Sequence, residues 1–128
     1  MTEKRRILVV DDNQDILDLA ATVLAGGGYE VGTASSGIDA LDLLAEERFD
    51  LVLLDINMPE MDGWQTLRLI RAESSMNDLP VVMFSIKGEI RDKMHSMQQG
   101  ALGYITKPFA VDELLESVGR VFDANRVH

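Results

Sequence analysis

The chain has 128 residues, 46% of them apolar, no cysteine and a net charge of −10. Its length and composition predict one folded domain with a single core, and they exclude disulfides and thiolate metal sites. The acidic balance disfavours direct nucleic-acid binding, which needs a cationic face. No apolar run approaches the roughly 20 residues that span a bilayer, so we expect no membrane insertion or signal peptide and a cytoplasmic location.

Apolar runs alternate with stretches of helical periodicity along the whole chain. We expect strands at residues 6–10, 29–34, 51–54, 80–84 and 103–106. We expect helices at residues 14–25, 37–47, 63–73, 89–99 and 111–123, the second with Ile38, Leu41, Leu44 and Ala45 facing inward. Short connections and regular alternation predict an α/β fold, a doubly wound parallel sheet with helices on both faces.

The pattern predicts one domain over residues 1–128, with its core at 5–123 and no output domain in this chain. Doubly wound sheets of five strands commonly have the order 2-1-3-4-5, and we take that order as a prior expectation. It places the first and third strands side by side. Ligands of such sheets bind outside the carboxyl ends of the strands.

Four of the five apolar runs end in a polar residue. These residues are Asp11 and Asp12 after the first run, Asp55 after the third, Ser85 after the fourth and Lys107 after the fifth. The expected strand order brings Asp11, Asp12 and Asp55 together. Two carboxylates about 4 Å apart repel by roughly 4 kcal/mol at an effective dielectric constant near 20, so such a cluster needs a proton or a cation.

Oxygen ligands and spare coordination positions for phosphate are typical of Mg²⁺ sites. The acidic cluster therefore indicates a Mg²⁺ site that also receives phosphate. The alternative is that Asp11 and Asp12 only cap the helix that begins near residue 14. Lys107 can pair with an aspartate and later with a phosphoryl oxygen, and the Lys107–Pro108 bond is a candidate cis bond. Ser85 can donate its hydroxyl to a phosphoryl oxygen.

Four segments together resemble one known family, the receiver domain of two-component response regulators, which has a CheY-like, flavodoxin-like fold. The segments are ILVVDDN, LVLLDINMPEMDGW, VVMFS and GALGYITKPF. Any one of them alone is weak evidence, whereas their order and spacing are highly specific. The resemblance covers essentially all of residues 5–123.

The resemblance implies that Asp55 accepts a phosphoryl group from a sensor histidine kinase, a histidine phosphotransfer protein or a small phosphodonor. It also implies that Asp12, Asp55 and the backbone carbonyl of Asn57 bind Mg²⁺, with Mn²⁺ as a substitute, and that Asp11 acts through a metal-bound water. Lys107 would neutralise the phosphoryl charge.

The same resemblance implies a switch. Ser85 would move toward the phosphoryl group, Tyr104 would turn inward, and the surface of the fourth helix, fifth strand and fifth helix would change for a downstream protein or a second copy of the chain. Three departures from the family pattern stand out. Ile86 is bulky and should narrow access to Asp55, Lys87 can steer or shield the attacking water, and Ala110 leaves the last helix without the usual N-cap.

Two other interpretations remain. A phosphohydrolase of the haloacid dehalogenase type also uses a strand-end aspartate, Mg²⁺, Ser or Thr, and Lys. Asn57 stands where that class needs a second aspartate, and the chain is too short for a substrate-binding cap domain. A receiver-like docking module that is never phosphorylated is disfavoured because every expected site residue is present. The sequence thus favours a signalling phosphoacceptor with only self-directed phosphotransfer and dephosphorylation.

Overall fold

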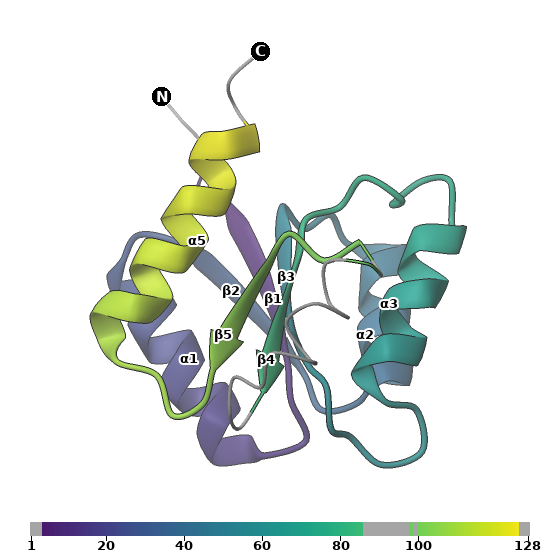
Figure 1. Cartoon of the computed structure of the whole chain (residues 1–128), viewed down its shortest axis with the longest axis horizontal. Coiled ribbons are helices and arrows are strands. Elements are labelled where there is room, and N and C mark those ends of the chain that lie inside the picture. The colour runs from purple at the N-terminus through teal and green to yellow at the C-terminus, as the bar shows by residue number, and fades with distance from the viewer. Residues whose placement is uncertain (1–3, 86–97, 99, 126–128) are drawn as a thin grey trace.

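The computed structural model describes residues 4–85, 98 and 100–125, which form a five-stranded sheet with helices on both faces (Figure 1). The strands are β1 (Arg6–Val10), β2 (Glu30–Ala34), β3 (Leu51–Asp55), β4 (Val81–Ser85) and β5 (Gly103–Thr106). The helices among the described residues are α1 (Gln14–Gly26), α2 (Gly37–Glu46), α3 (Gly63–Ala72) and α5 (Val111–Asn125). The helix expected at 89–99 falls outside the described residues.

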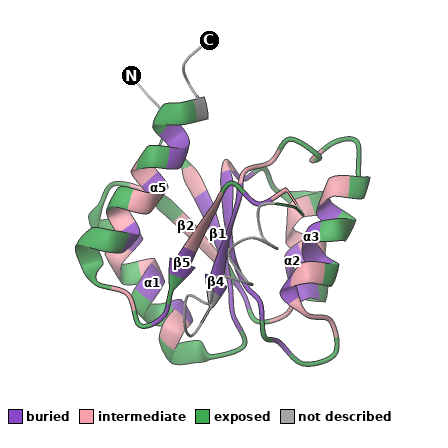
Figure 2. Cartoon of the chain, viewed as in Figure 1, coloured by how far each residue is buried: buried purple, intermediate pink, exposed green. Residues whose placement is uncertain are grey.

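All four strand pairs are parallel, and the strand order is β2-β1-β3-β4-β5. The expected fold class and strand order are therefore confirmed. The central strands are apolar at nearly every position because helices cover both faces, and every residue of β3 is buried (Figure 2). Among the described residues, no helix is long and apolar enough to cross a membrane.

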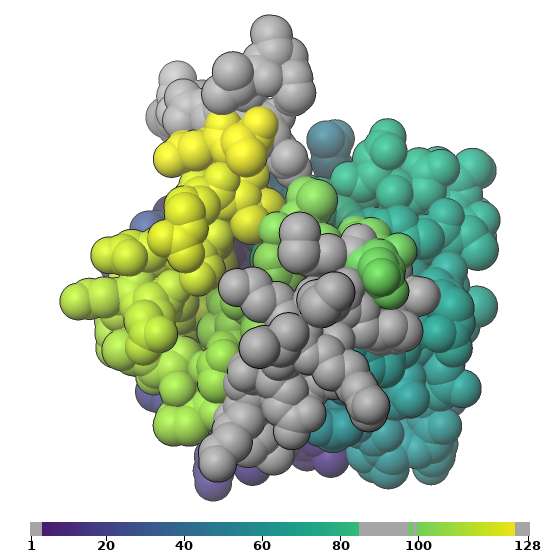
Figure 3. Space-filling view, viewed as in Figure 1, coloured from purple at the N-terminus to yellow at the C-terminus, as the bar shows by residue number. Residues whose placement is uncertain are grey.

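The alternation of side chains along each strand divides the core into two clusters. Val9, Leu53 and Val82 pack with α1 and α5 on one face. Their neighbours, such as Leu54 and Met83, pack with α2 and α3 on the other. In the space-filling view, α5 (yellow to green) and α3 (teal) accordingly lie on opposite sides of the molecule (Figure 3).

Side chains at the helix starts satisfy backbone N–H groups that have no partner within the helix. The carboxamide of Asn13 accepts from the amides of Asp15 and Ile16 at the start of α1. Ser36 caps α2, and Asp62 forms a reciprocal capping box with Gln65 at the start of α3. These caps fix where the three helices leave the loops near the carboxyl ends of the strands.

One expected feature of α2 is wrong. Ile38 is 52% exposed, and Ala45 is also exposed. The inward positions of the first turn are held by Gly37 and Ala40. A side chain at Gly37 would collide with Thr66 and Met61. Small residues therefore face α3 because the two helices approach closely, and the larger Ile38 points outward.

Candidate functional site

The candidate site lies at the carboxyl end of the sheet. It is directly beyond the core cluster on the face that α1 and α5 cover. Asp11 follows β1, Asp55 ends β3 and Lys107 follows β5. Each lies two positions beyond a residue of that cluster, and these three residues are Val9, Leu53 and Ile105. Because side chains alternate with a period of two, the three polar groups extend from the same face of the sheet.

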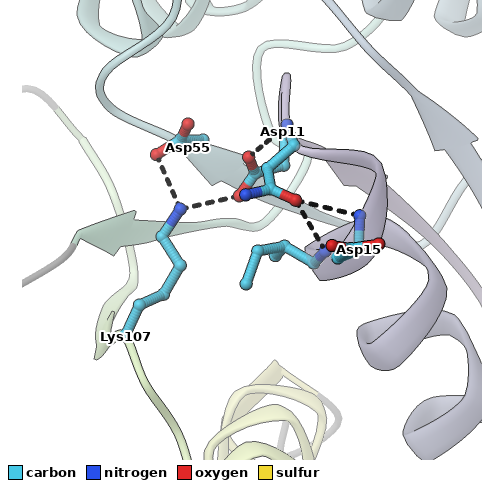
Figure 4. A network of polar contacts seen from close by, with 6 residues as sticks. Asp11, Asp15, Asp55 and Lys107 are labelled. Atoms are coloured by element: carbon cyan, nitrogen blue, oxygen red, sulfur yellow. Dashed lines mark hydrogen bonds and ion pairs between the residues drawn. The ribbon is translucent and has the colours of Figure 1, made fainter.

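Lys107 joins the two buried carboxylates. Its Nζ lies 2.7 Å from Oδ2 of Asp11 and 3.2 Å from Oδ1 of Asp55 (Figure 4). Asp11 is wholly buried, Asp55 is 3% exposed and Lys107 is 9% exposed. The ammonium therefore neutralises part of a charge cluster that water barely reaches.

Asp12 completes a group of three acids. One carboxylate oxygen from each of Asp11, Asp12 and Asp55 lies within 4.8 Å of the others. Asp12 is exposed, whereas the other two are buried, so the cluster opens to solvent on one side. Three hard oxygen donors with one solvent-facing side fit a small divalent cation that keeps some of its waters.

The surroundings of Asp55 disfavour the ionised form of its carboxyl group. Burial raises the pKa of Asp55 to about 6, and the negative charge of Asp11 adds to this effect. Lys107 and the backbone amide of Asn57 act in the opposite direction. For Lys107, burial alone would lower the pKa, but its bonds to Asp11 and Asp55 outweigh burial and raise it. Lys107 is therefore charged at neutral pH.

Asp11 is held by two partners at once. Its Oδ2 accepts from Lys107, and its Oδ1 accepts from the backbone amide of Asn13 at 3.0 Å. Asn13, and neither Asp11 nor Asp12, is the residue that caps α1. The interpretation of the two aspartates as simple helix caps is therefore wrong.

The loop after Asp55 is fixed by backbone contacts. The amide of Gly63 donates to the carbonyl of Ile56 at 2.8 Å, and the amide of Ile56 donates to the carbonyl of Phe84 at 3.1 Å. A side chain at Gly63 would collide with the carbonyl oxygen of Asp55. The start of α3 therefore packs directly against the backbone that carries Asp55.

Five further residues were expected at the site, and the structure describes only some of them. Asn57 is exposed. Tyr104 is half-buried and packs against the core cluster of the α2–α3 face. Ser85 ends β4 in register with Thr106, and its side chain lies outside the description. Ile86 and Lys87 lie outside the described residues. The Lys107–Pro108 bond is cis, as the sequence suggested.

Two aromatic residues at the site were missed by the sequence analysis. Phe84 stacks on Phe109 with ring centroids 5.7 Å apart and an interplanar angle of 9°, and Nζ of Lys107 lies 5.9 Å from the centroid of Phe84. Phe84 belongs to an apolar strand and so resembled an ordinary core residue. Its register opposite Asp55 on β3 is the signal that could have identified it.

Comparison with known proteins assigns this arrangement to a family. The model of the response regulator receiver domain matches residues 7–119, and the chain belongs to this family. The resemblance inferred from the four sequence segments is thereby confirmed.

Similar curated proteins are longer than this chain. The DNA-binding dual master transcriptional regulator RpaA of a Synechocystis strain is 38% identical over 113 residues, which cover 88% of this chain and 47% of that protein. The response regulator MprA of a Mycobacterium strain is 39% identical over 110 residues, which cover 86% of this chain and 47% of that protein. The chain thus spans about half the length of these relatives.

Similar solved structures have nearly the same extent as this chain. Chemotaxis protein CheY4 of Vibrio cholerae, crystallised at low pH, has a TM-score of 0.89 and 33% identity, and the match covers 93% of this chain and 99% of that one. The receiver domain of NtrX from Brucella abortus has a TM-score of 0.85 and 37% identity, covering 91% and 98%.

Proposed function

We propose that this chain is a single receiver module in a phosphorelay and that Asp55 is its phosphoacceptor. Membership of the receiver family supports the phosphorelay role. The observation that carries the residue assignment is the position of Asp55 at the end of β3, buried, bonded to Lys107 and within 4.8 Å of Asp11 and Asp12 through ligand oxygens. Asp11 is also buried, bonded to Lys107 and part of the carboxylate cluster, so the position at the end of β3 is what distinguishes Asp55.

Asp55 performs the proposed transfer as a nucleophile in its ionised form. A carboxylate oxygen of Asp55 forms a bond to phosphorus while the bond from phosphorus to the donor breaks. The electron pair leaves with the donor atom, which is a nitrogen of a phosphohistidine or an oxygen of a small acyl phosphate. Lys107 already lies 3.2 Å from Asp55, so its ammonium needs only a small movement to pair with a phosphoryl oxygen.

Asp12 and Asp55 are the proposed side-chain ligands of a Mg²⁺ ion, with the carbonyl of Asn57 as a third ligand and Asp11 holding a bound water. Mn²⁺ is the proposed substitute. When bound, the ion supplies positive charge that offsets the charges of the carboxylates and the phosphoryl group. Asp11 keeps one oxygen on the amide of Asn13, which orients it toward the cluster.

The proposed output is a change at the face formed by the fourth helix, β5 and α5. Added phosphoryl charge would attract the hydroxyl of Ser85, and Tyr104 would follow. A cavity of about 230 Å³ next to β5 and α5 supports this face as the responsive one, and Leu102, Tyr104 and Arg120 are among the residues that line it. Ile86 and Lys87 are proposed to tune access to Asp55.

The proposed upstream partner is a sensor histidine kinase or a histidine phosphotransfer protein. The downstream partner is a protein that binds the switched face, or a second copy of this chain, with no direct contact to nucleic acid. A cytoplasmic location belongs to the same proposal. The chain would have no separate substrate, and the comparisons do not favour the dehalogenase-type phosphohydrolase.

Phosphorylation by a small donor tests this function. We expect acetyl phosphate with Mg²⁺ to add one phosphoryl group of about 80 Da, detected by intact mass, and chelation of the metal to prevent it. Asp55→Asn should abolish the adduct, whereas Asp42→Asn, which alters an exposed carboxylate of α2, should retain it. An adduct of equal yield on Asp55→Asn would disprove the assignment.

A further inference from the structure

Phe84 and Phe109 form an aromatic pair next to Lys107. Phe84 is wholly buried in β4, in register with Asp55 on one neighbouring strand and with Ile105 on the other. Lys107 lies two residues beyond Ile105. The ring of Phe84 therefore occupies the space between the strand that carries Asp55 and the strand that leads to Lys107.

The position of this ring matters for the ammonium group. Nζ of Lys107 lies 5.9 Å from the centroid of Phe84, within the range in which a cation is attracted by an aromatic face. The ring offers the ammonium no acceptor lone pair and fills space that water would otherwise occupy. The protons of the ammonium therefore remain directed toward Asp11 and Asp55, which accept them at 2.7 and 3.2 Å.

Phe109 holds the ring of Phe84 in this place. The two rings are stacked at 5.7 Å and 9°, and Phe109 packs against the core cluster of the α1–α5 face. Phe109 comes two residues after Lys107, so the segment that carries the lysine also carries the residue that supports the ring beneath it.

We propose that Phe84 is a positioning residue for phosphoryl transfer, and that its ring, supported by Phe109, holds the ammonium of Lys107 between Asp11 and Asp55. Phe84 does not touch the reacting atoms and acts only through Lys107. The kinetic consequence of this inference rests on the proposed function of Asp55. The placement of the ammonium itself can be tested without any phosphoryl transfer.

A double-mutant cycle tests the kinetic part. In the wild-type background, Phe84→Leu should slow phosphorylation by acetyl phosphate roughly two- to fivefold, the size expected from one cation–π contact. In a Lys107→Met background, Phe84→Leu should cause no further slowing, because the group through which it acts is gone. Phe84→Met, whose unbranched side chain fills irregular space without a ring, should behave like Phe84→Leu. Equal slowing in both backgrounds would overturn the proposal.

Phe122→Leu is the matched control. Phe122 is also buried, pairs with an aromatic ring at 5.6 Å and has a cation over its face, the guanidinium of Arg5 at 4.5 Å. It lies in the C-terminal part of α5, and that end of the helix lies away from the carboxyl ends of the strands (Figure 1). Its replacement should therefore lower stability as much as Phe84→Leu does and leave the phosphorylation rate unchanged.

The placement of the ammonium is tested in metal-free protein by nitrogen-15 NMR of the lysine side chains. The Lys107 ammonium, identified by the loss of its signal in Lys107→Met, should exchange its protons slowly in the wild type and at least several-fold faster in Phe84→Leu. Unchanged exchange would refute the positioning role even if phosphorylation proceeds. Faster exchange in a protein that takes no phosphoryl group would instead retain the positioning role and reject the proposed function.

Discussion

At the scale of single residues, Asp55 carries a charge that the fold disfavours. Its pKa is raised from 3.8 to about 6, so the folded chain binds this proton more tightly than the unfolded chain does. The contribution of Asp55 to the free energy of unfolding therefore falls as the pH rises from about 4 to about 6 and is constant above that range. Under the proposed function, the ionised carboxylate is the reactive form, so this cost accompanies the proposed chemistry.

Asp55→Asn should remove the free-energy cost of holding an ionised carboxylate at this buried position. We expect the metal-free variant to be more stable than the wild type at pH 7.5 by about 1 to 3 kcal/mol and to show little difference near pH 4. Urea denaturation at the two pH values, without divalent ions, measures both numbers. A stability gain of the same size at pH 4 and pH 7.5 would contradict the raised pKa.

Glu60 has a strained backbone conformation. Its φ is +68°, in the left-handed region that favours glycine. We expect Glu60→Gly to raise the free energy of unfolding by roughly 0.5 to 1 kcal/mol, whereas Glu60→Gln, which removes only the charge, should change it little. Thermal denaturation of the two variants side by side provides the comparison, and equal effects would rule out backbone strain as the cause.

At the scale of elements, α5 differs from the other described helices at its start. Ala110 offers no side-chain acceptor, and the carboxylate of Glu113 accepts from the backbone amide of Ala110 at 3.1 Å. Only half of a capping box is therefore present, in agreement with the missing N-cap expected from the sequence. Ala110→Ser should complete the box and stabilise the protein by about 1 kcal/mol, whereas Ala110→Val should not. Chemical denaturation distinguishes the two, and a serine variant no more stable than the valine variant would contradict this account.

The positions of the strands could be predicted from the sequence, whereas the placement of some side chains could not. Apolar runs located the strands to within one residue at each end, because burial on both faces leaves little freedom of composition. Periodicity misplaced Ile38, because the close approach of α2 to α3 selects the small Gly37 and depends on tertiary packing. It also missed Phe84, whose role depends on strand register.

The geometry of the site was only partly predictable for the same reason. Strand ends and strand order brought Asp11, Asp12, Asp55 and Lys107 together. The preference of Lys107 for Asp11, at 2.7 Å against 3.2 Å for Asp55, follows from side-chain packing that no sequence pattern records. The helix expected at 89–99 stays a prediction.

At the scale of the whole molecule, cation binding and folding should be linked. An ion that binds only the folded chain raises its stability in proportion to the logarithm of the ion concentration above the dissociation constant. We expect millimolar Mg²⁺ to raise the thermal midpoint at pH 7.5, to do so less at pH 5, where Asp55 is largely protonated, and to have little effect on Asp55→Asn. Scans with KCl of matched ionic strength control for screening. An equal response to Mg²⁺ in wild type and Asp55→Asn would exclude Asp55 as a ligand.

Chemical trapping of the phosphorylated residue tests most directly whether Asp55 is the site of phosphorylation. Borohydride reduces an aspartyl phosphate to homoserine, which peptide mass spectrometry can locate in the chain after phosphorylation with acetyl phosphate and Mg²⁺. We expect homoserine at position 55 alone. Homoserine at position 11 or 12 with position 55 unmodified would contradict this assignment.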